Sequence, residues 1–408
     1  MCDYIREAVE LAAEQRLSRR GFMTGSAAIA GAGLAGASSI ASASARPVDR
    51  AHAAPPSSAR GFRTRVVLLG TAGGPVWWHE TRREGISSAV VVNGSVYLVD
   101  CGEGVGRQYR RAGLGGTGVN DGLERLRGIF LTHLHSDHII DYPNVWLFGL
   151  FQGLPNALEP VQVYGPGNRG KLPPVFGPAP PPPVVNPGNP TPGTVEMTES
   201  LLQAYAADIN DRMRDNRARD PRTLIEPHDI ALPPGVVSDP NVDPAPPMAP
   251  FSVVEDDNVR VTATLVQHAP VFPAFAFRFD SDDGAVVFSG DTAPSENLVS
   301  LARGADVLVH EVIDRRWVMS LFPDPSEPRA KALIRHLLDA HTTIEDVGAV
   351  AERAEVKTLV LSHLAPANNP DARWRKAGKN FSGRLVVGRD LHEIGVGRRR
   401  GGQRRAPR

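Results

Sequence analysis

The sequence contains almost no cysteine. Only Cys2 and Cys101 occur among 408 residues, and Cys2 lies in a leading segment that we expect to be removed. The single remaining thiol excludes an intramolecular disulfide. The fold therefore rests on a buried hydrophobic core, which a chain of this length can form. Cys101 directly follows the strand-like run 96–100, which predicts a small buried residue at that position.

Net charge is also lacking. Acidic and basic residues number 45 each, so no overall field attracts nucleic acid or an anionic membrane. The distribution is uneven, because six arginines lie within residues 398–408. We expect residues 396–408 to form a basic disordered tail, with an interaction patch as the alternative.

Long hydrophobic runs are absent except near the N-terminus. There Ser18-Arg19-Arg20-Gly21-Phe22 precedes a weakly apolar stretch rich in Ala and Gly, which resembles a twin-arginine export signal. This stretch is too rich in small residues for a permanent membrane span. We therefore expect a signal peptide over residues 1–45, a linker over 46–62 and no stable membrane anchor. The twin-arginine translocase would deliver the protein to the periplasm, the cell wall or the exterior; an unrelated flexible extension is the alternative.

The rest of the chain shows two β-rich halves with helices between and after them. Asn93-Gly94 between two apolar runs is the strongest hairpin signal. Two such halves predict an α/β fold of two packed sheets with helices outside. Helices are expected at 104–112 and 343–354, and strands at 65–69, 88–92, 95–99, 128–131, 161–164, 259–265, 275–279, 285–288, 307–309 and 359–361.

An insertion separates the halves. Ten prolines lie within residues 173–192, which predicts an exposed, extended segment. Residues 196–217 show helical spacing of apolar side chains and predict one amphipathic helix. We treat 166–250 as an insertion within a hydrolase domain over 63–395. Its helix packs over that domain, or alternatively lines a substrate cleft.

The most informative motif is Thr132-His133-Leu134-His135-Ser136-Asp137-His138, which directly follows the apolar run 128–131. Alternate side chains of a strand share a face, so His133 and His135 can point to one centre. Asp137 and His138 can then turn toward a second. Imidazole and carboxylate are the groups that bind Zn²⁺ and similar ions, so this loop predicts the start of two adjacent metal sites. The alternative is a solvated, histidine-rich turn.

Three later residues complete a pattern. His268 and His363 lie near strand ends, and Asp291 lies in a Gly-Asp-Thr turn. In this order the chain resembles the metallo-β-lactamase superfamily over about residues 64–395, which implies a four-layer αββα sandwich. The resemblance also implies two metal ions, one bound by His133, His135 and His268, the other by Asp137, His138 and His363, with Asp291 bridging both.

Smaller motifs resemble one branch of that superfamily, which contains ribonuclease Z and the metal-dependent arylsulfatases. They are residues 69–75, 100–104, 309–311 and 341–343. In ribonuclease Z the corresponding His-Ser-Thr histidine lies beside the metals and donates a proton, which implies that role for His341. His310 matches the histidine of a His-Glu-Ala-Thr segment, although Val312-Ile313 follow here. We expect His310 to make a structural hydrogen bond.

The ligand set predicts a hydrolytic mechanism. Two divalent ions about 3.5–4 Å apart can share a hydroxide that attacks an electrophilic centre. His341 is the candidate acid for the leaving oxygen, and Asp137 can alternatively take up the proton of the nucleophile. We expect Zn²⁺, with Mn²⁺ or Fe as alternatives.

Several substrates fit this chemistry. We predict an exported hydrolase of a small-molecule ester, most like an arylsulfatase. A ribonuclease Z-like phosphodiesterase and a lactonase are alternatives, and a metal-binding relic of the fold is the non-enzymatic one. Export argues against precursor tRNA, and the insertion lacks a dense basic arm for phosphate contacts. Nucleic acid is therefore not the expected partner. A homodimer is compatible with the resemblance, because members of the superfamily often pair.

Overall fold

The computed structural model describes residues 59, 61–177 and 180–397. The predicted signal peptide and all of the predicted basic tail beyond residue 397 lie outside the described residues. In the part of the chain that is described, no helix has the length and apolar character needed to cross a membrane.

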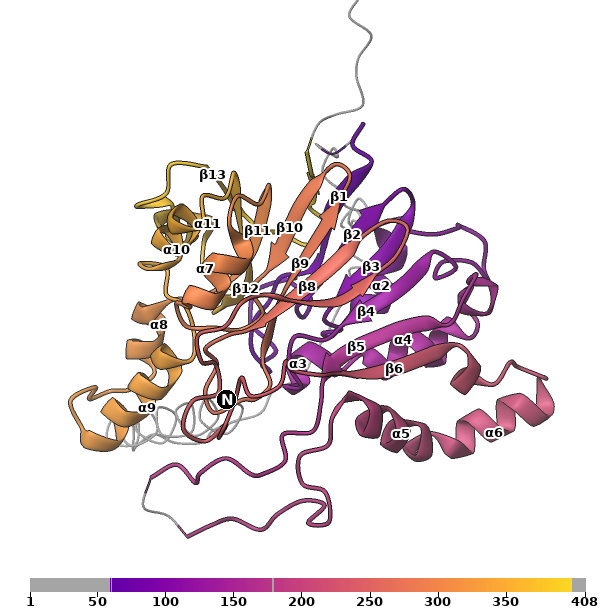
Figure 1. Cartoon of the computed structure of the whole chain (residues 1–408), viewed down its shortest axis with the longest axis horizontal. Coiled ribbons are helices and arrows are strands. Elements are labelled where there is room, and N and C mark those ends of the chain that lie inside the picture. The colour runs from indigo at the N-terminus through magenta and orange to yellow at the C-terminus, as the bar shows by residue number, and fades with distance from the viewer. Residues whose placement is uncertain (1–58, 60, 178–179, 398–408) are drawn as a thin grey trace, which may run out of the picture.

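Two seven-stranded mixed sheets form the centre of the molecule (Figure 1). Their strand orders are β14-β1-β2-β3-β4-β5-β6 and β13-β12-β11-β10-β9-β8-β7. The first sheet comprises β1 (Thr64–Gly70), β2 (Ser87–Val92), β3 (Ser95–Val99), β4 (Leu126–Phe130), β5 (Val161–Pro166), β6 (Ile225–Ile230) and β14 (Glu393–Gly395). The second comprises β7 (Phe251–Glu255), β8 (Arg260–Leu265), β9 (Phe275–Ser281), β10 (Gly284–Phe288), β11 (Val307–Ile313), β12 (Thr358–Ala365) and β13 (Arg384–Val387).

Helices cover the outer faces of both sheets, so the molecule has the four-layer αββα arrangement that the sequence predicted (Figure 1). The first sheet is covered by α2 (Val105–Arg111) and α4 (Tyr142–Gly149), and the second by α7 (Glu296–Ala302) and α10 (Val347–Arg353). The other α-helices of the described residues are α3 (Ser136–Ile139), α5 (Thr194–Ala204), α6 (Ala206–Asp215), α8 (Arg315–Ser320), α9 (Pro328–Asp339) and α11 (Asp371–Trp374).

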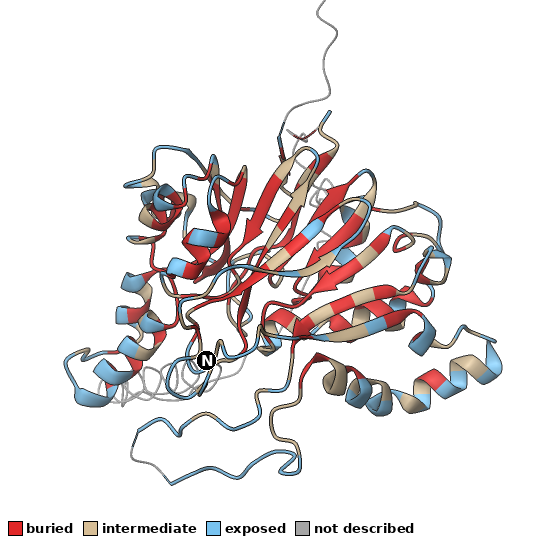
Figure 2. Cartoon of the chain, viewed as in Figure 1, coloured by how far each residue is buried: buried red, intermediate tan, exposed pale blue. Residues whose placement is uncertain are grey.

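Continuous apolar runs form the central strands because both faces of each sheet are buried. Along β1, Val66 and Leu68 belong to the core between the sheets, whereas Val67 and Leu69 pack against the helices. Between the sheets, the ring of Phe130 lies 5.0 Å from that of Phe279. Figure 2 shows the buried residues concentrated in the two sheets.

The hairpin prediction at Asn93-Gly94 is confirmed. Both residues have positive φ, 52° and 90°, as the two central residues of a type I′ turn require. Cys101 is fully buried, also as predicted.

Two predictions for the insertion need correction. The single helix expected over 196–217 is two helices, α5 and α6, which are separated at Tyr205. Residues 225–230, which we included in the insertion, form β6 at the edge of the first sheet. The proline-rich segment is largely exposed, as predicted, and extends below the sheets in Figure 1.

Candidate metal centre

Three of the predicted ligands lie at the same distance in sequence from the end of a strand. His133, His268 and Asp291 each lie three residues beyond a strand end, since β4 ends at 130, β8 at 265 and β10 at 288. β8 and β10 run in the same direction on either side of β9. The amide of Phe275 donates to the carbonyl of Thr132 over 2.9 Å, which joins the second sheet to the histidine loop. One edge of the sandwich therefore collects all three side chains.

His363 reaches this edge from within β12. Its φ is +46°, in the left-handed region that is uncommon for residues other than glycine. Asp100, directly after β3, also has a positive φ, +59°. Such backbone conformations cost about 1–3 kcal/mol and accumulate at functional sites. Both residues contact the histidine loop.

The structure brings all seven predicted ligands together in two groups that share Asp291. One potential ligand atom from each member lies within 4.8 Å of the others in its group. The groups are His133, His135, His268 and Asp291, and Asp137, His138, Asp291 and His363.

The two oxygens of the Asp291 carboxylate face different groups of ligands. Its Oδ2 lies 3.8 Å from Nε2 of His133 and of His268. Its Oδ1 lies 3.3 Å from Nε2 of His138 and of His363. Each oxygen thus faces one group, as a carboxylate that bridges two ions would.

The glycine-rich loop after β1 contacts the second group of ligands, Asp137, His138, Asp291 and His363. The amide of Gly74 lies 3.1 Å from Oδ2 of Asp137 and 3.3 Å from Nε2 of His363. The loop is joined to β12, because the amide of Gly73 donates to Leu364 and that of Leu364 donates to Thr71. A Cβ at Gly73 would lie 2.5 Å from Nδ1 of His363. Glycine at this position therefore lets the imidazole approach Asp137.

Other residues orient the imidazoles. Nδ1 of His138 lies 2.8 Å from Oδ2 of Asp100, and Nδ1 of His268 lies 2.9 Å from the carbonyl of Ala340. Asp100 in turn accepts from the amide of Thr132 over 2.8 Å. Hydrogen bonds of this kind fix which imidazole nitrogen is left for a metal.

Burial and charge set the protonation states. Burial lowers the pKa of His133 and His268 far below the usual range and that of His135 to about 4, which leaves neutral imidazoles. Burial opposes ionisation of Asp291, but His363 and His138 hold the pKa of that carboxyl well below its ordinary value. Burial likewise disfavours charge on His138, yet the surrounding carboxylates raise its pKa. A field this negative attracts cations.

These residues fit metal ions. Both oxygens of Asp291 and Nε2 of His138 are buried without a hydrogen bond to any described group. Leaving such groups without a partner is costly, and neutral imidazoles with carboxylates are the donors that divalent ions such as zinc accept. The cluster and its fold indicate divalent metal ions.

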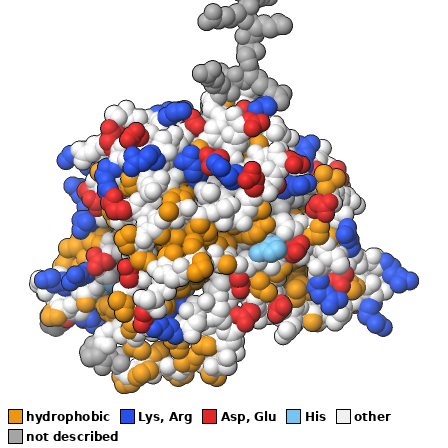
Figure 3. All heavy atoms as spheres, viewed as in Figure 1, with side chains coloured by type: hydrophobic (Ala, Val, Ile, Leu, Met, Phe, Trp, Pro, Cys, Tyr) orange, Lys and Arg blue, Asp and Glu red, His pale blue; other side chains and the backbone are white. Residues whose placement is uncertain are grey.

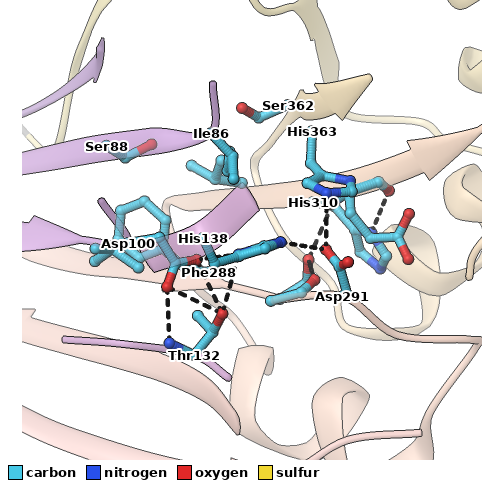
Figure 4. A pocket seen from close by; sticks show the side chains of 15 residues that line it. Ile86, Ser88, Asp100, Thr132, His138, Phe288, Asp291, His310, Ser362 and His363 are labelled. Carbon is cyan, nitrogen blue, oxygen red and sulfur yellow. Dashed lines mark hydrogen bonds and ion pairs between the residues drawn. The ribbon is translucent and has the colours of Figure 1, made fainter. Parts of the chain in front are cut away.

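Figure 4 shows His138 between Asp100 and Asp291. The same residues line a cavity of about 30 Å³ between the sheets, with Ser88, His310 and Ser362, which is large enough for a water molecule. Nδ1 of His310 donates to the backbone carbonyl of Glu311 over 2.7 Å, consistent with the structural hydrogen bond predicted for it.

His341 lies against both groups. Its ring centroid is 5.1 Å from that of His268 and 6.2 Å from that of His363. Nδ1 of His341 lies 2.9 Å from Oε1 of Glu311, while its buried Nε2 has no hydrogen bond within the described part of the chain. Glu311 therefore orients His341 with one nitrogen free.

The sequence alone predicts no role for Asp100, Glu311 or Gly74. Asp100 and Glu311 lie next to Cys101 and His310, within motifs on which the family resemblance rests, so the sequence did indicate that these positions matter. Their contacts could not be predicted, because the contact of Asp100 with His138 joins residues 38 positions apart and that of Glu311 with His341 joins residues 30 positions apart.

The fold and the shared-carboxylate cluster define a dinuclear metal-dependent hydrolase. The family model of the metallo-beta-lactamase superfamily matches residues 82–146. The family model of the beta-lactamase superfamily domain matches residues 220–364. Ribonuclease Z of Mycobacterium bovis (strain BCG / Pasteur 1173P2) is 32% identical over 338 residues, which cover 82% of this chain and 99% of the relative. The chain belongs to the metallo-β-lactamase superfamily, in the branch that contains ribonuclease Z.

A second relative and one solved structure support the same family and fold. Ribonuclease Z of Mycobacterium marinum (strain ATCC BAA-535 / M) is 31% identical over 334 residues, covering 81% of this chain and 98% of the relative. The crystal structure of human tRNase Z, short form, aligns with a TM-score of 0.50 at 18% identity, covering 81% of this chain and 99% of that chain, which supports the fold. Because both relatives carry the name ribonuclease, they weigh against our expectation that nucleic acid is not a partner.

We expect Gly73→Ala to weaken metal binding. Its Cβ would meet the ring of His363 at 2.5 Å and the backbone carbonyl carbon of His363 at 2.8 Å, so the imidazole must move away from Asp137. The affinity for one of two ions should fall about 10–100-fold, the usual cost of misplacing a ligand's support. Titration with Zn²⁺ measures this. Gly188→Ala, where a Cβ meets nothing within 4 Å, is the control; equal affinities in both variants would contradict the arrangement.

We expect Asp100→Asn to weaken metal binding by a similar factor. The amide cannot serve both Thr132 and the Nδ1–H of His138 as two carboxylate oxygens do, so the ring loses its fixed orientation. Isothermal titration with Zn²⁺ would reveal the change. Unaltered binding would show that Asp100 only supports the fold.

Proposed function

We propose that the seven clustered residues hold two Zn²⁺ ions and that the protein is a phosphodiesterase that cleaves RNA. The carrying observation is the Asp291 carboxylate, which divides between two ligand groups beside an imidazole with a free nitrogen. Two-metal sites suit in-line displacement at phosphorus, because the ions activate water and stabilise the attacking and leaving oxygens. The ribonuclease name of relatives that match most of the chain supports RNA as the substrate class.

The chain's own residues supply the proton transfers. Asp137, held by the Gly74 amide, accepts the proton that the attacking water loses. As the new P–O bond forms and the bond to the leaving oxygen breaks, Nε2 of His341 gives that oxygen a proton. Glu311 accepts a hydrogen bond from the opposite nitrogen, so it sets the direction of the imidazole. General acid catalysis of this kind contributes about 10²–10⁴-fold.

A substrate panel tests the proposal. The purified, metal-analysed protein would be offered an RNA oligonucleotide, bis(p-nitrophenyl) phosphate, p-nitrophenyl sulfate, a lactone and a β-lactam. Metal-dependent turnover of the two phosphodiesters supports the proposal. Turnover of the lactone or the β-lactam alone would contradict it.

Hydrolysis of an aryl sulfate is the second candidate. The indole of Trp78 is tied to the glycine-rich loop, because its Nε1 donates to the carbonyl of Gly73 over 2.8 Å. It packs edge-on against Trp317 with ring centroids 5.3 Å apart. An apolar aromatic pair next to the ligand loop suits an aryl leaving group. Faster turnover of p-nitrophenyl sulfate than of either phosphodiester would favour this candidate.

We also propose that the protein is exported, on the basis of the Arg19-Arg20 pattern. Its RNA substrate is then met outside the cytoplasm rather than as precursor tRNA. Replacing both arginines by lysine should leave the protein inside cells that export the wild type, as fractionation and immunoblotting would show. Equal fractionation of the two forms would contradict export.

A further inference from the structure

A basic pocket lies near the carboxyl ends of β11 and β12, in the second sheet. It is lined by Arg316 of α8, by Ile344 and Glu345, and by Arg373, Arg375, Lys376, Lys379 and Asn380 of α11 and the turn that follows. Its volume is about 430 Å³. Five of the lining residues are cationic and one is acidic, so the pocket has a strong positive excess.

Most of these cations are not neutralised within the protein. Arg373 is engaged, with its guanidinium 2.6 Å from Asp314 and 3.0 Å from Glu345. The side chains of Arg316, Lys376 and Lys379 form no hydrogen bond or ion pair with any residue that the structure describes, and all three are exposed.

The segment that supplies most of the pocket, residues 371–389, is also rich in positive charge. Residues 371–389 contain six Lys or Arg and a single acidic residue, Asp371. Figure 3 shows basic side chains recurring over α10 and α11 at the upper left, with acidic ones between them. Neighbouring cations that lack an acidic partner, as Arg316, Lys376 and Lys379 do among the described residues, raise the free energy of the folded state, which an anionic ligand would offset.

The pocket is joined to the catalytic residues by short chain segments. Ile344 lies three residues after His341, a span of at most about 11 Å, and its amide donates to the carbonyl of Ile313 at the end of β11. Arg373 binds Asp314, whose amide donates to Ala365, two residues after His363.

We propose that this pocket binds backbone phosphates of the RNA that lie outside the bond that is cleaved. The inference rests on the proposed function. Phosphate contacts position a polynucleotide without reading its sequence. The pocket would therefore favour oligonucleotides over a dinucleotide, whose single phosphate occupies the metal centre.

The test compares two substrates with the same reacting bond. kcat/KM is measured for a ten-nucleotide RNA and for a dinucleoside monophosphate, with wild type and with the double variant Lys376→Glu/Lys379→Glu. The ratio of the two values should fall about tenfold in the variant, mainly through a higher KM for the longer RNA. The salt dependence of that KM should also become shallower, because each lost phosphate contact removes about 0.7 from the logarithmic slope for a single strand.

Two further variants sharpen the result. Arg316→Glu changes the pocket from a different element, α8, and should lower the same ratio. Arg125→Glu is the matched control, because Arg125 is exposed just before β4, at the strand end opposite the histidine loop. Circular dichroism would verify that each variant folds.

The outcomes are distinct. A wild type that cleaves the long RNA with a ratio unaltered in both pocket variants would overturn the phosphate pocket and leave the proposed function intact. A wild type that cleaves bis(p-nitrophenyl) phosphate but neither RNA would overturn RNA as the substrate, and the pocket with it. If inorganic phosphate changed turnover of the dinucleotide in wild type but not in the double variant, the pocket would serve a free anion, which also overturns the proposal.

Discussion

Asp291→Ala is expected to remove both metal ions together and to lower phosphodiester turnover at least about 10³-fold. Each oxygen of this carboxylate faces one ligand group, at 3.3 Å from His138 and His363 and at 3.8 Å from His133 and His268. Removing it therefore takes a ligand from each group and leaves the imidazoles without the negative charge between them. The loss of a preorganised charge at a reaction centre costs about 10²–10³-fold by itself, and loss of the activated water adds to it.

Metal analysis by inductively coupled plasma mass spectrometry, together with turnover of bis(p-nitrophenyl) phosphate, measures this effect. Asp257→Ala is the control, because Asp257 is an exposed carboxylate in the turn between β7 and β8. A variant that lost one ion and kept the other at full occupancy would contradict the bridging role of Asp291.

His341→Gln is expected to lower kcat for RNA about 10²–10³-fold without changing the metal content. Its Nε2 is the buried nitrogen left free when Glu311 bonds Nδ1, so it is the available proton donor for the leaving alkoxide. The loss should be much smaller for bis(p-nitrophenyl) phosphate, because p-nitrophenoxide leaves readily without a proton. This difference between substrates separates an acid from a residue that merely supports the fold.

Glu311→Gln should reproduce the same pattern with a smaller loss, since the imidazole stays in place but is less well oriented. His336→Gln is the control, because His336 packs against Phe176 and lies outside the ligand pattern. An equal loss for both phosphodiesters would show that His341 does not act as the acid.

Much of this site could be predicted because its signals are local. The apolar run before Thr132 gives a strand end, and the spacing of His133, His135, Asp137 and His138 gives a ligand loop on it. Asp291, His268 and His363 became meaningful only through their order along the chain, which the resemblance supplied. The structure adds the geometry, in which three strands of two sheets end at one edge.

Other features depend on packing and leave no local signal. Apolar spacing continues through Tyr205, so periodicity cannot show that α5 ends and α6 begins there. β6 contains Pro227, which disfavours a strand in the sequence, yet the strand lies at the edge of the sheet, where proline is tolerated. The pairing of Glu311 with His341 links two segments that meet only after β11 and the turn before α10 have packed.

The substrate class is where sequence reasoning and the relatives differ. The even charge balance and the export motif favoured a small ester, whereas relatives that match most of the chain carry the ribonuclease name. The charge balance is a property of the whole chain and does not reveal a local excess such as that of residues 371–389.

The most direct test of a two-metal phosphodiesterase is cleavage of an RNA oligonucleotide before chelation, after chelation and after Zn²⁺ is returned. We expect cleavage by the purified protein, its loss when the ions are removed and its recovery when two Zn²⁺ per chain are restored, with Asp291→Ala inactive throughout. Cleavage that survives complete removal of the metal, or a protein with two bound ions that hydrolyses p-nitrophenyl sulfate but no phosphodiester, would contradict it.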